Sequence, residues 1–454
     1  MEDSTNFQAG AAKVDITPSL GTIIGADFLP HYARFIHDPL FSKSLVFRNK
    51  KDIIVIIVVD VCIMDTDFMD DVKSKILWVT GIEPINVLLA SNHNHAAGDI
   101  INLLGGAADV AYKKKLPNLI VESVRLAKAN LQPAKIASDL VNVPEYVRCR
   151  RYLMAEGYEA KNPVTRKNDI VKTNPFGGED KIIEPAAKTD PELSFLAVKT
   201  LDGKWISVLA NYSLHYVGDW PDDSITADYF GEFSRQIQEK LGADDEFIGI
   251  MSNGTSGDVN IWDFMNPDRF PKEHYAKTKL IGGNLAQKVY EKMGNLTWEI
   301  EPNISVKYDE LTLNLRKPSA EELALAMQGF IENDFNNLSL KPDMIQRIYD
   351  REQVLLNEYS DTATLGVQAI KIGNLIIGAL PGEFFAETGL KLKEGINLYN
   401  YFTISLANSY GGYVPPAHEI DRGGYETWRA RSSFLEQNAE EKIRGKLAEL
   451  IREI

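Results

Sequence analysis

The sequence predicts an α/β fold in which mixed sheets are surrounded by helices, and three observations lead to this prediction. Residues 52–60 (DIIVIIVVD) are almost all β-branched and apolar, which is typical of a strand buried on both faces. Apolar residues recur at helical spacing elsewhere, and the stretch from about 109 to 130 presents one such face. No internal repeat, low-complexity tract or linker divides the 454 residues, so we expect one large domain that spans 1–454.

The first 130 residues are expected to read strand, helix, strand, helix. Strands are predicted at about 9–18, 52–60 and 85–90, and helices at about 65–78 and 109–130. Pro117 lies inside the second helix, so this helix either is kinked there or begins there. Residues 156–185 are rich in Lys, Asn, Gly, Pro and Asp and predict a long irregular loop, of the kind that usually lines a site or is disordered.

The rest of the chain continues the mixture of strands and helices. Strands are predicted at about 193–200, 205–213, 246–251, 305–315 and 403–407, with two short strands within 365–379 that turn at Gly373-Asn374. Helices are predicted at about 229–241, 274–293, 320–333 and 343–359, followed by a C-terminal amphipathic helix that includes 443–454.

Charge and composition argue against several classes of protein. A net charge of −15 argues against a nucleic-acid binder, which needs a basic stripe, and against attraction to an anionic membrane surface. No apolar run of 18 residues exists, so no transmembrane segment is expected. The N-terminus lacks the basic and apolar regions of a signal peptide, so we expect either a cytoplasmic protein or an exported one whose signal has been removed. Two cysteines, Cys62 and Cys149, do not make a disulfide framework.

The most informative stretch is 91–99 (SNHNHAAGD), which directly follows the predicted strand at 85–90. His93 and His95 are two of only seven histidines, and they stand where the strand gives way to a loop of small residues. Strand ends of this kind present metal ligands and catalytic groups on a rigid scaffold. Taken alone, the pair also fits two polar loop residues, so the interpretation depends on finding further ligands.

Three other strand ends supply candidates for those ligands. His215 comes just past a predicted strand, and Glu383 follows a Pro-Gly turn at the end of another. Glu383 is expected in the first turn of a helix, where its alternative role is to interact with the helix dipole. Tyr410 and Tyr413 come after the last predicted strand. Neutral imidazoles with one carboxylate and an open position are the ligand set of a catalytic zinc.

These segments resemble those of the neutral ceramidase family, in the same order along the chain. SNHNHAAGD and NYSLHYVGDW resemble its two histidine segments, and PGEFFAETG resembles its PGEF segment. NSYGGYVPP, followed by Tyr425-Glu426, resembles its NxYxxY…YE segment with the same twelve-residue step from Tyr413 to Tyr425. The resemblance covers the chain from residue 9 to about 425. It implies a zinc-dependent hydrolase that cleaves the amide bond of an N-acylsphingosine, with a single zinc as cofactor and a small-molecule or lipid N-acyl substrate as partner.

The resemblance also assigns roles to individual residues. It implies that the zinc ligands are His93, His215, Glu383 and Tyr413, with Tyr410 as the rival of Tyr413. His95 is expected beside the metal as a hydrogen-bonding or proton-transfer group. The remaining expected catalytic residues are Tyr425, which stabilises the tetrahedral intermediate, and Arg150 in VRCRRYLM, for which Arg151 is the alternative.

Two departures from the family pattern affect the expected substrate. Asn260, at the end of NGTSGDVN, stands where the family has its active-site serine, so it is expected to act only as a hydrogen-bond donor to an oxyanion. The chain is also expected to lack the C-terminal β-sandwich-like domain of full-length members. Two alternatives therefore stay open: a zinc-dependent deacylase or esterase acting on a carbohydrate or other small polar substrate, and a metal-binding homologue without catalysis.

Overall fold

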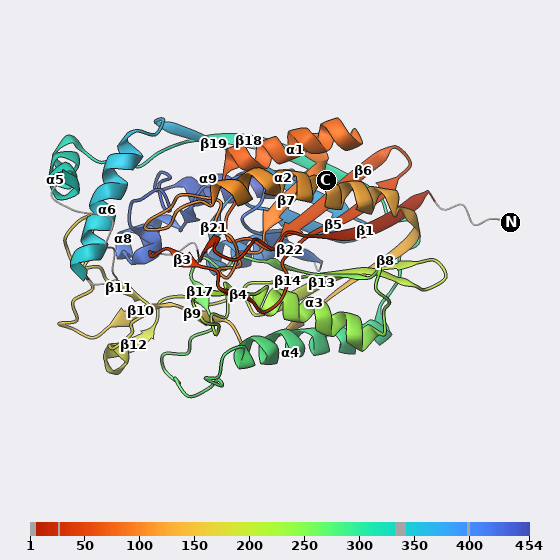
Figure 1. Cartoon of the computed structure of the whole chain (residues 1–454), viewed down its shortest axis with the longest axis horizontal. Helices are drawn as coiled ribbons and strands as arrows, with labels where there is room; N and C mark the ends of the chain where they lie inside the picture. Colours follow the sequence, from red (N-terminus) through yellow and green to blue (C-terminus); the bar gives the residue numbers. More distant parts are fainter. Residues whose placement is uncertain (1–5, 26–27, 332–341, 397–399) are drawn as a thin grey trace.

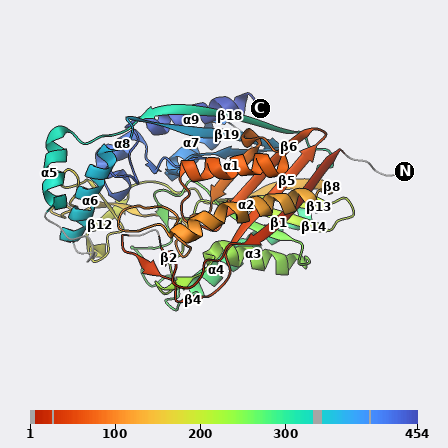
Figure 2. The ribbon, with the colours of Figure 1, turned by 45° about the horizontal axis from the view of Figure 1, so that its top comes forward.

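The computed structural model describes residues 6–25, 28–331, 342–396 and 400–454 and is built on two sheets that pack face to face (Figures 1 and 2). The larger sheet has eight strands in the order β16-β14-β13-β8-β1-β5-β6-β7, and the smaller has four in the order β18-β19-β20-β22. This is the mixed α/β class that the sequence predicts.

The strands of the larger sheet are mostly antiparallel, with parallel pairs at its two ends. In chain order they are β1 (Phe7–Asp15), β5 (Phe41–Asn49), β6 (Asp52–Val59), β7 (Val87–Ser91), β8 (Gln132–Asn142), β13 (Glu192–Thr200), β14 (Trp205–Tyr212) and β16 (Ile248–Asn253). The parallel pairs are β6 with β7 and β14 with β16. The carboxyl ends of β7 and β14 lead directly to the two histidine segments.

The smaller sheet brings the carboxyl-terminal segments onto the larger one. It consists of β18 (Ile304–Asn314), β19 (Thr362–Ile372), β20 (Leu375–Ala379) and β22 (Tyr401–Ile404). Apolar side chains of both sheets form one buried core, in which Phe47 and Ile56 of the larger sheet share a cluster with Ile377 and Phe402 of the smaller. The predicted turn at Gly373-Asn374 joins β19 to β20, and Gly373 adopts the left-handed conformation that the turn requires, with φ +61°.

Helices cover the outer face of each sheet. The larger sheet is covered by α1 (Thr66–Thr80) and α2 (Val110–Ala129) over one part, and by α3 (Asp228–Leu241) and α4 (Ala276–Lys292) over another. The smaller sheet is covered by α7 (Ala386–Ile396) and α9 (Ala439–Arg452). Three further helices are α5 (Ala320–Ile331), α6 (Pro342–Asn357) and α8 (Ala417–Arg422); α5 and α6 lie at the left end of Figure 1.

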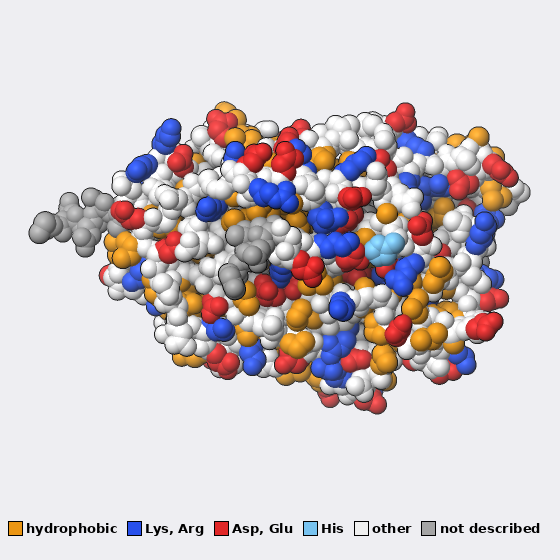
Figure 3. Space-filling view, turned by 180° about the vertical axis from the view of Figure 1, so that it is seen from behind, with side chains coloured by type: hydrophobic (Ala, Val, Ile, Leu, Met, Phe, Trp, Pro, Cys, Tyr) orange, Lys and Arg blue, Asp and Glu red, His pale blue; other side chains and the backbone are white. Residues whose placement is uncertain are grey.

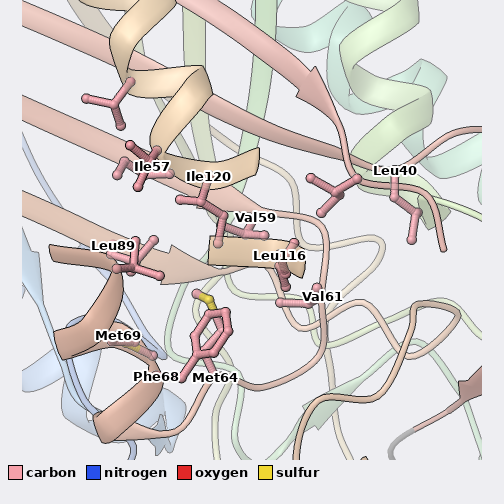
Figure 4. Packing of buried hydrophobic residues seen from close by; sticks show 14 of the residues in the cluster. Leu40, Ile57, Val59, Val61, Met64, Phe68, Met69, Leu89, Leu116 and Ile120 are labelled. Carbon is pink, nitrogen blue, oxygen red and sulfur yellow. The ribbon is translucent and has the colours of Figure 1, made fainter. Parts of the chain in front are cut away.

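The apolar run at 52–60 behaves as predicted, because β6 is buried on both faces. Ile54 and Ile56 point into the core between the sheets, whereas Ile57 and Val59 pack under the helices. Figure 4 shows the helix side, where these two residues share a cluster with Leu116 and Ile120 of α2. Alternation along a strand sends successive side chains to opposite faces, so a continuous apolar run is required of a central strand between two layers.

Helix positions are mostly as predicted. Asp65 caps α1 by accepting a hydrogen bond from the Phe68 N–H at 2.8 Å, and Asp109 caps α2 in the same way through Tyr112. The second helix therefore begins at Val110 and runs through Pro117 rather than beginning at the proline. The predicted end of the 320–333 helix lies partly outside the described residues, because α5 is described only to Ile331.

Two parts of the predicted organisation are wrong. Strand β5 was not predicted, so the first 130 residues do not read strand, helix, strand, helix, and β8, which follows them, was not predicted either. The apolar pattern of β5 is interrupted by Ser42 and Ser44, yet both are buried, since their hydroxyls hydrogen-bond to Ser123 of α2 at 2.9 and 2.6 Å. A sequence pattern predicts that such serines are exposed, because it does not show the buried partner to which they hydrogen-bond.

The expected irregular loop at 156–185 is only partly irregular. It contributes β11 (Val171–Thr173) and β12 (Ile182–Pro185), which flank β10 (Arg151–Met154) in a three-stranded sheet. These strands are too short to give a period-2 signal. The small sheet holds the Arg150-Arg151 segment from one side and so helps to position these two arginines.

The surface charge and the helix composition of the described residues can be compared with the sequence. Among the described residues visible in Figure 3, acidic and basic side chains are intermixed and form no continuous basic stripe. Within the described ranges, no helix combines the length and apolar character needed to cross a bilayer.

Lys73 of α1 gives a stability prediction. Its side chain is buried, and burial lowers its pKa from 10.5 to about 8, although Asp70 and Glu310 act in the opposite direction. The unfolded chain then binds more protons than the folded chain between these two values. The free energy of unfolding should therefore rise from pH 8 to 10.5, by about 2–3 kcal/mol from this residue. Urea unfolding of Lys73→Met should show this rise removed relative to the parent, and an unchanged pH slope would contradict the assignment.

Candidate metal centre

Three buried side chains from distant segments converge at one end of the sheets. His93 follows β7, His215 follows β14, and Glu383 lies in the two-residue strand β21 (Glu383–Phe384). The Nε2 atoms of the two histidines are 2.9 Å apart, and Glu383 Oε2 lies 3.2 Å from His93 Nε2 and 4.0 Å from His215 Nε2. Their exposed fractions are 1%, 1% and 4%. Glu383 is thus in a strand three residues before α7, and its predicted place in the first turn of a helix is wrong.

The hydrogen bonds of these groups indicate that the cluster fits a cation. His93 Nδ1 lies 3.1 Å from the carbonyl oxygen of Cys62, and His215 Nδ1 lies 3.2 Å from that of Ser256. A carbonyl only accepts, so each Nδ1 carries the proton and each Nε2 presents a lone pair. Two lone pairs 2.9 Å apart cannot hydrogen-bond to each other, and Glu383 Oε2 is buried with no hydrogen-bond partner. A cation bound by all three atoms would satisfy them.

Electrostatics favour the neutral form of the His215 imidazole, which is the form that a metal ligand must adopt. Burial, followed by the neighbouring His93 and by Arg150, lowers the pKa of His215 well below its usual range. His93 itself adopts a left-handed backbone conformation with φ +71°, which is unusual for a residue other than glycine. Such a conformation is retained where the surrounding structure fixes it, and it often marks a functional position.

Strand register places Tyr413 beside the cluster, while the hydroxyl of its rival Tyr410 is buried without a hydrogen-bond partner among the described residues and also interacts with Glu383. Strand β23 (Tyr413–Val414) pairs in parallel with β21, so that Tyr413 lies directly opposite Glu383. The Tyr413 hydroxyl accepts a hydrogen bond from Arg150 Nη2 at 3.0 Å, and Arg150 Nη1 lies 3.4 Å from His215 Nε2. Tyr413 therefore borders the cluster and is placed to add an oxygen to it. Burial, reinforced by Glu383, raises the pKa of its phenol well above the usual range, although Arg150 acts in the opposite direction.

Arg150 rather than Arg151 reaches the cluster, and a buried carboxylate holds both. Arg150 Nε donates to Glu426 Oε1 at 2.6 Å, and Arg151 Nη1 donates to Glu426 Oε2 at 2.8 Å. Arg151 then turns away to Glu419, at 2.8 Å. Burial would raise the pKa of Glu426, but the two guanidiniums outweigh it and lower the pKa below its usual value. The Arg–Glu–Arg chain thus fixes Arg150 against Tyr413.

Glu426 is therefore expected to be the residue on which this network depends. Glu426→Gln leaves two buried guanidiniums without their shared negative charge, which should cost about 3–5 kcal/mol of unfolding free energy. Urea unfolding of the variant measures this loss. Glu449→Gln, on the exposed side of α9, is the matched control and should stay close to the parent. A Glu426 variant as stable as that control would mean that the network contributes little.

His95 lies beside the cluster as expected, although the chain there is not an extended segment. Its Nδ1 lies 3.0 Å from the carbonyl oxygen of Gly25, so its Nε2 also presents a lone pair, 3.2 Å from His93 Nε2. Burial, together with the neighbouring His93, lowers the pKa of His95 well below its usual range. His95 and His93 meet because the left-handed turn at His93 folds the loop back, and not because of an alternation along a strand.

The two other expected catalytic residues, Tyr425 and Asn260, have different neighbours. The Tyr425 ring makes an edge contact with the Tyr413 ring at 5.6 Å between centroids, and the Arg150 guanidinium lies 6.0 Å from its centroid. Asn260 lies in β17 (Val259–Asn260), and its Nδ2 donates to Asn174 Oδ1 at 2.7 Å. That bond uses one of the two amide hydrogens, so the expected role of Asn260 as an oxyanion donor depends on the other and stays a prediction.

Sequence reasoning missed two groups next to the cluster. Glu426 stands beside Tyr425 in the quoted motif, but its partners Arg150 and Arg151 are more than 270 positions away and no local pattern reveals them. Tyr216 stands next to His215, and its ring lies 4.3 Å from that of His95. An aromatic residue beside a candidate ligand was the available signal.

Comparisons of this chain with known proteins find similarity to neutral ceramidases. No protein-family model matches the chain. Neutral ceramidase A of Dictyostelium discoideum is 20% identical over 518 residues, which cover 94% of this chain and 70% of the relative. The crystal structure of a neutral ceramidase from Pseudomonas aeruginosa superposes with a TM-score of 0.74 at 16% identity, over 99% of this chain and 75% of that one. The chain has the neutral ceramidase fold.

A second solved structure, a ceramidase complexed with C2, has a TM-score of 0.71 at 15% identity and covers 99% of this chain and 76% of its own. The resemblance to neutral ceramidases that the motifs carry is therefore confirmed, and so is the predicted fold class. Because the neutral ceramidase fold is matched over nearly the whole chain, both sheets and the candidate metal centre lie within the matched region.

Proposed function

We propose that the chain is a zinc-dependent amidohydrolase of the neutral ceramidase type, which hydrolyses the N-acyl amide bond of a ceramide-like N-acylsphingosine. The observation that carries the proposal is the convergence of two imidazole lone pairs and an unpartnered carboxylate oxygen beside Tyr413. The neutral ceramidase fold and the Dictyostelium relative support the substrate class. Hydrolysis of such a lipid would place the protein in sphingolipid metabolism.

The proposed ligands are His93, His215, Glu383 and Tyr413. Two nitrogens and two oxygens form a donor set that suits zinc. A bound zinc lowers the pKa of its water to roughly 7 and polarises a carbonyl oxygen.

The surrounding residues would act on the substrate and on protons. His95 presents an unprotonated Nε2 towards the cluster, so it is placed to accept a proton and then return it to the leaving amine. Tyr425 is the proposed donor to the developing oxyanion. Arg150 holds the Tyr413 oxygen in place, because its other contacts to Glu426 and to the Gly257 carbonyl at 2.7 Å leave it little freedom.

The test combines metal analysis with a substrate panel. The purified chain should carry stoichiometric zinc, lose activity after chelation, and regain it with added zinc. Mass spectrometry should detect free sphingoid base and fatty acid from N-acylsphingosines. Release of acetate from N-acetylated sugars, with no attack on ceramides, would instead favour the carbohydrate deacylase. Zinc without turnover of any amide or ester in the panel would favour a non-catalytic homologue.

A further inference from the structure

Two lysines stand opposite each other on the core-facing side of neighbouring strands. Lys13 of β1 and Lys43 of β5 are direct partners in the antiparallel register. Side chains alternate along a strand, so Lys13 points to the same side as Ala11 and Lys43 to the same side as Leu45, and both of these apolar residues belong to the core between the sheets. Like charges directly opposite each other destabilise a strand pair, so this pair calls for a compensating negative charge.

A cavity of about 510 Å³ lies over these two lysines, and we call it the lysine cavity. Strand β1 pairs with β5 along its whole length but with β8 only at Gln8 and Ala9, so the larger sheet opens beyond that point. The cavity lies at this opening and is lined by residues of α3, of β1 and β5, and of β16. Figure 2 shows β1 beside α3. The volume is that of a pocket for a small organic molecule.

Lys43 has unused hydrogen-bonding capacity in the wall of the lysine cavity. It is only 3% exposed, and its Nζ makes two long contacts, 3.4 Å to Asp60 Oδ1 and 3.3 Å to Ser234 Oγ. The Asp60 carboxylate is held at shorter distances by Asn92 Nδ2 at 2.7 Å and by the Phe41 N–H at 2.8 Å. An ammonium group has three hydrogens, so at least one hydrogen of Lys43 remains for another acceptor.

Lys13 supplies a positive charge that no carboxylate neutralises directly. Among the described residues it forms no ion pair, and burial followed by the charge of Lys43 lowers its pKa below the usual value, although Asp245 and Asp60 act in the opposite direction. Arg235, the other basic residue of the wall, already has carboxylate partners. Because Lys43 is balanced by Asp60, the cavity has one positive charge in excess, which suits a singly charged anion.

One part of the cavity wall is apolar. Pro39, Phe41 and Phe247 line it. The Lys13 ammonium lies 5.0 Å from the centroid of the Phe41 ring, in a cation–π contact that places the charge at the edge of this apolar part. A molecule with an anionic group at one end and an apolar body at the other matches this arrangement.

We propose that the lysine cavity binds a singly charged organic carboxylate. The carboxyl group accepts hydrogen bonds from Lys43 and Lys13, and the apolar body lies against Phe41 and Phe247. None of the residues that line the cavity belongs to the candidate metal centre, so the two sites are separate. The inference therefore goes beyond the proposed function and does not depend on it.

The test variants leave Lys43 intact. Asp60, the partner of Lys43, also binds Asn92 at the start of the first histidine segment, so a change at Lys43 could disturb the candidate metal centre. Lys13→Gln instead removes a charge at the exposed rim of the cavity. Ser234→Phe fills the cavity from α3 without changing any charge.

The experiment is isothermal titration calorimetry of the purified chain with 3-phenylpropionate. The acid should bind saturably, whereas its neutral counterpart, 3-phenylpropanamide, should not bind measurably. Lys13→Gln should weaken binding of the acid about tenfold, the scale of one lost hydrogen bond to a charged group. Ser234→Phe should abolish binding. Lys272→Gln removes the same charge from an exposed site outside the cavity and should keep the Kd of the parent.

A parallel titration with octanoate distinguishes the two sources of the carboxylate. The tighter binder of the two acids shows whether the apolar part of the cavity takes an aromatic ring or an aliphatic chain. Circular dichroism of Ser234→Phe should match that of the parent, which shows that the filled variant is folded.

Four results would overturn the proposal. The first is equal affinity for the acid and the amide, and the second is an unchanged Kd in both Lys13→Gln and Ser234→Phe. The third is a site that is lost on chelation but retained in Ser234→Phe, because the acid would then bind at the metal centre. The fourth is tighter binding of phenyl phosphate than of 3-phenylpropionate, which would contradict a singly charged ligand.

Discussion

His93→Ala should abolish zinc retention after dialysis, whereas the parent should keep stoichiometric zinc. The substitution removes one of the two imidazole lone pairs that converge at 2.9 Å, and the remaining ligands would be a histidine, a carboxylate and a phenol. Activity should fall to background, since the proposed reaction depends on the metal. Atomic emission analysis of dialysed protein measures the effect directly.

A matched control guards against a general loss of structure. His37→Ala removes an exposed histidine that stacks on Tyr275 at 3.7 Å, outside the candidate centre, and should leave zinc binding unchanged. Circular dichroism should show that both variants are folded. Stoichiometric zinc in the His93 variant would mean that the proposed ligand set is wrong.

His95→Ala should keep zinc and lose turnover by a factor on the order of 10² or more, the scale of a lost general acid–base group. Its Nε2 faces the centre, but its Nδ1 bond to Gly25 crosses to a different segment, so some loss of stability is also expected. His95→Gln keeps a polar side chain of similar length and should restore stability without restoring turnover.

The measurements separate three roles for His95. Retained zinc with a large fall in kcat identifies a proton-transfer group. Loss of zinc would make His95 a ligand. A large fall in melting temperature, with near-normal turnover in the fraction that stays folded, would make it structural.

The positions of the proposed ligands along the chain could be predicted, because each ligand comes after a buried strand. A strand such as β7 is visible in the sequence as an apolar run, and the residues directly after such a strand lie at the sheet edge. The local sequence pattern therefore predicts that His93 and His215 lie at strand ends. It does not predict that the two side chains meet, because this depends on the positions of β7 and β14 in the sheet. Only the resemblance to the family implied that arrangement.

The parts that could not be predicted depend on polar groups satisfied at long range. Strand β5 was missed because Ser42 and Ser44 read as exposed, although Ser123 satisfies both. Glu426 was quoted in a motif without a role, because its contacts to Arg150 and Arg151 appear only after folding. Burial of a polar side chain depends on its partner, and the partner is not encoded nearby.

The origin of the four proposed ligands in both sheets has a consequence for folding. Two come after strands of the larger sheet, and two come after β20 and β22 of the smaller. No partly folded chain that lacks either sheet holds the complete set, so a metal ion would bind the native state alone. By mass action it would then stabilise that state by RT ln(1 + [L]/Kd), about 4 kcal/mol at a thousandfold excess over Kd. Such an ion would therefore link the two sheets only after both have formed. It could not nucleate their assembly, but it would slow the unfolding step in which they separate.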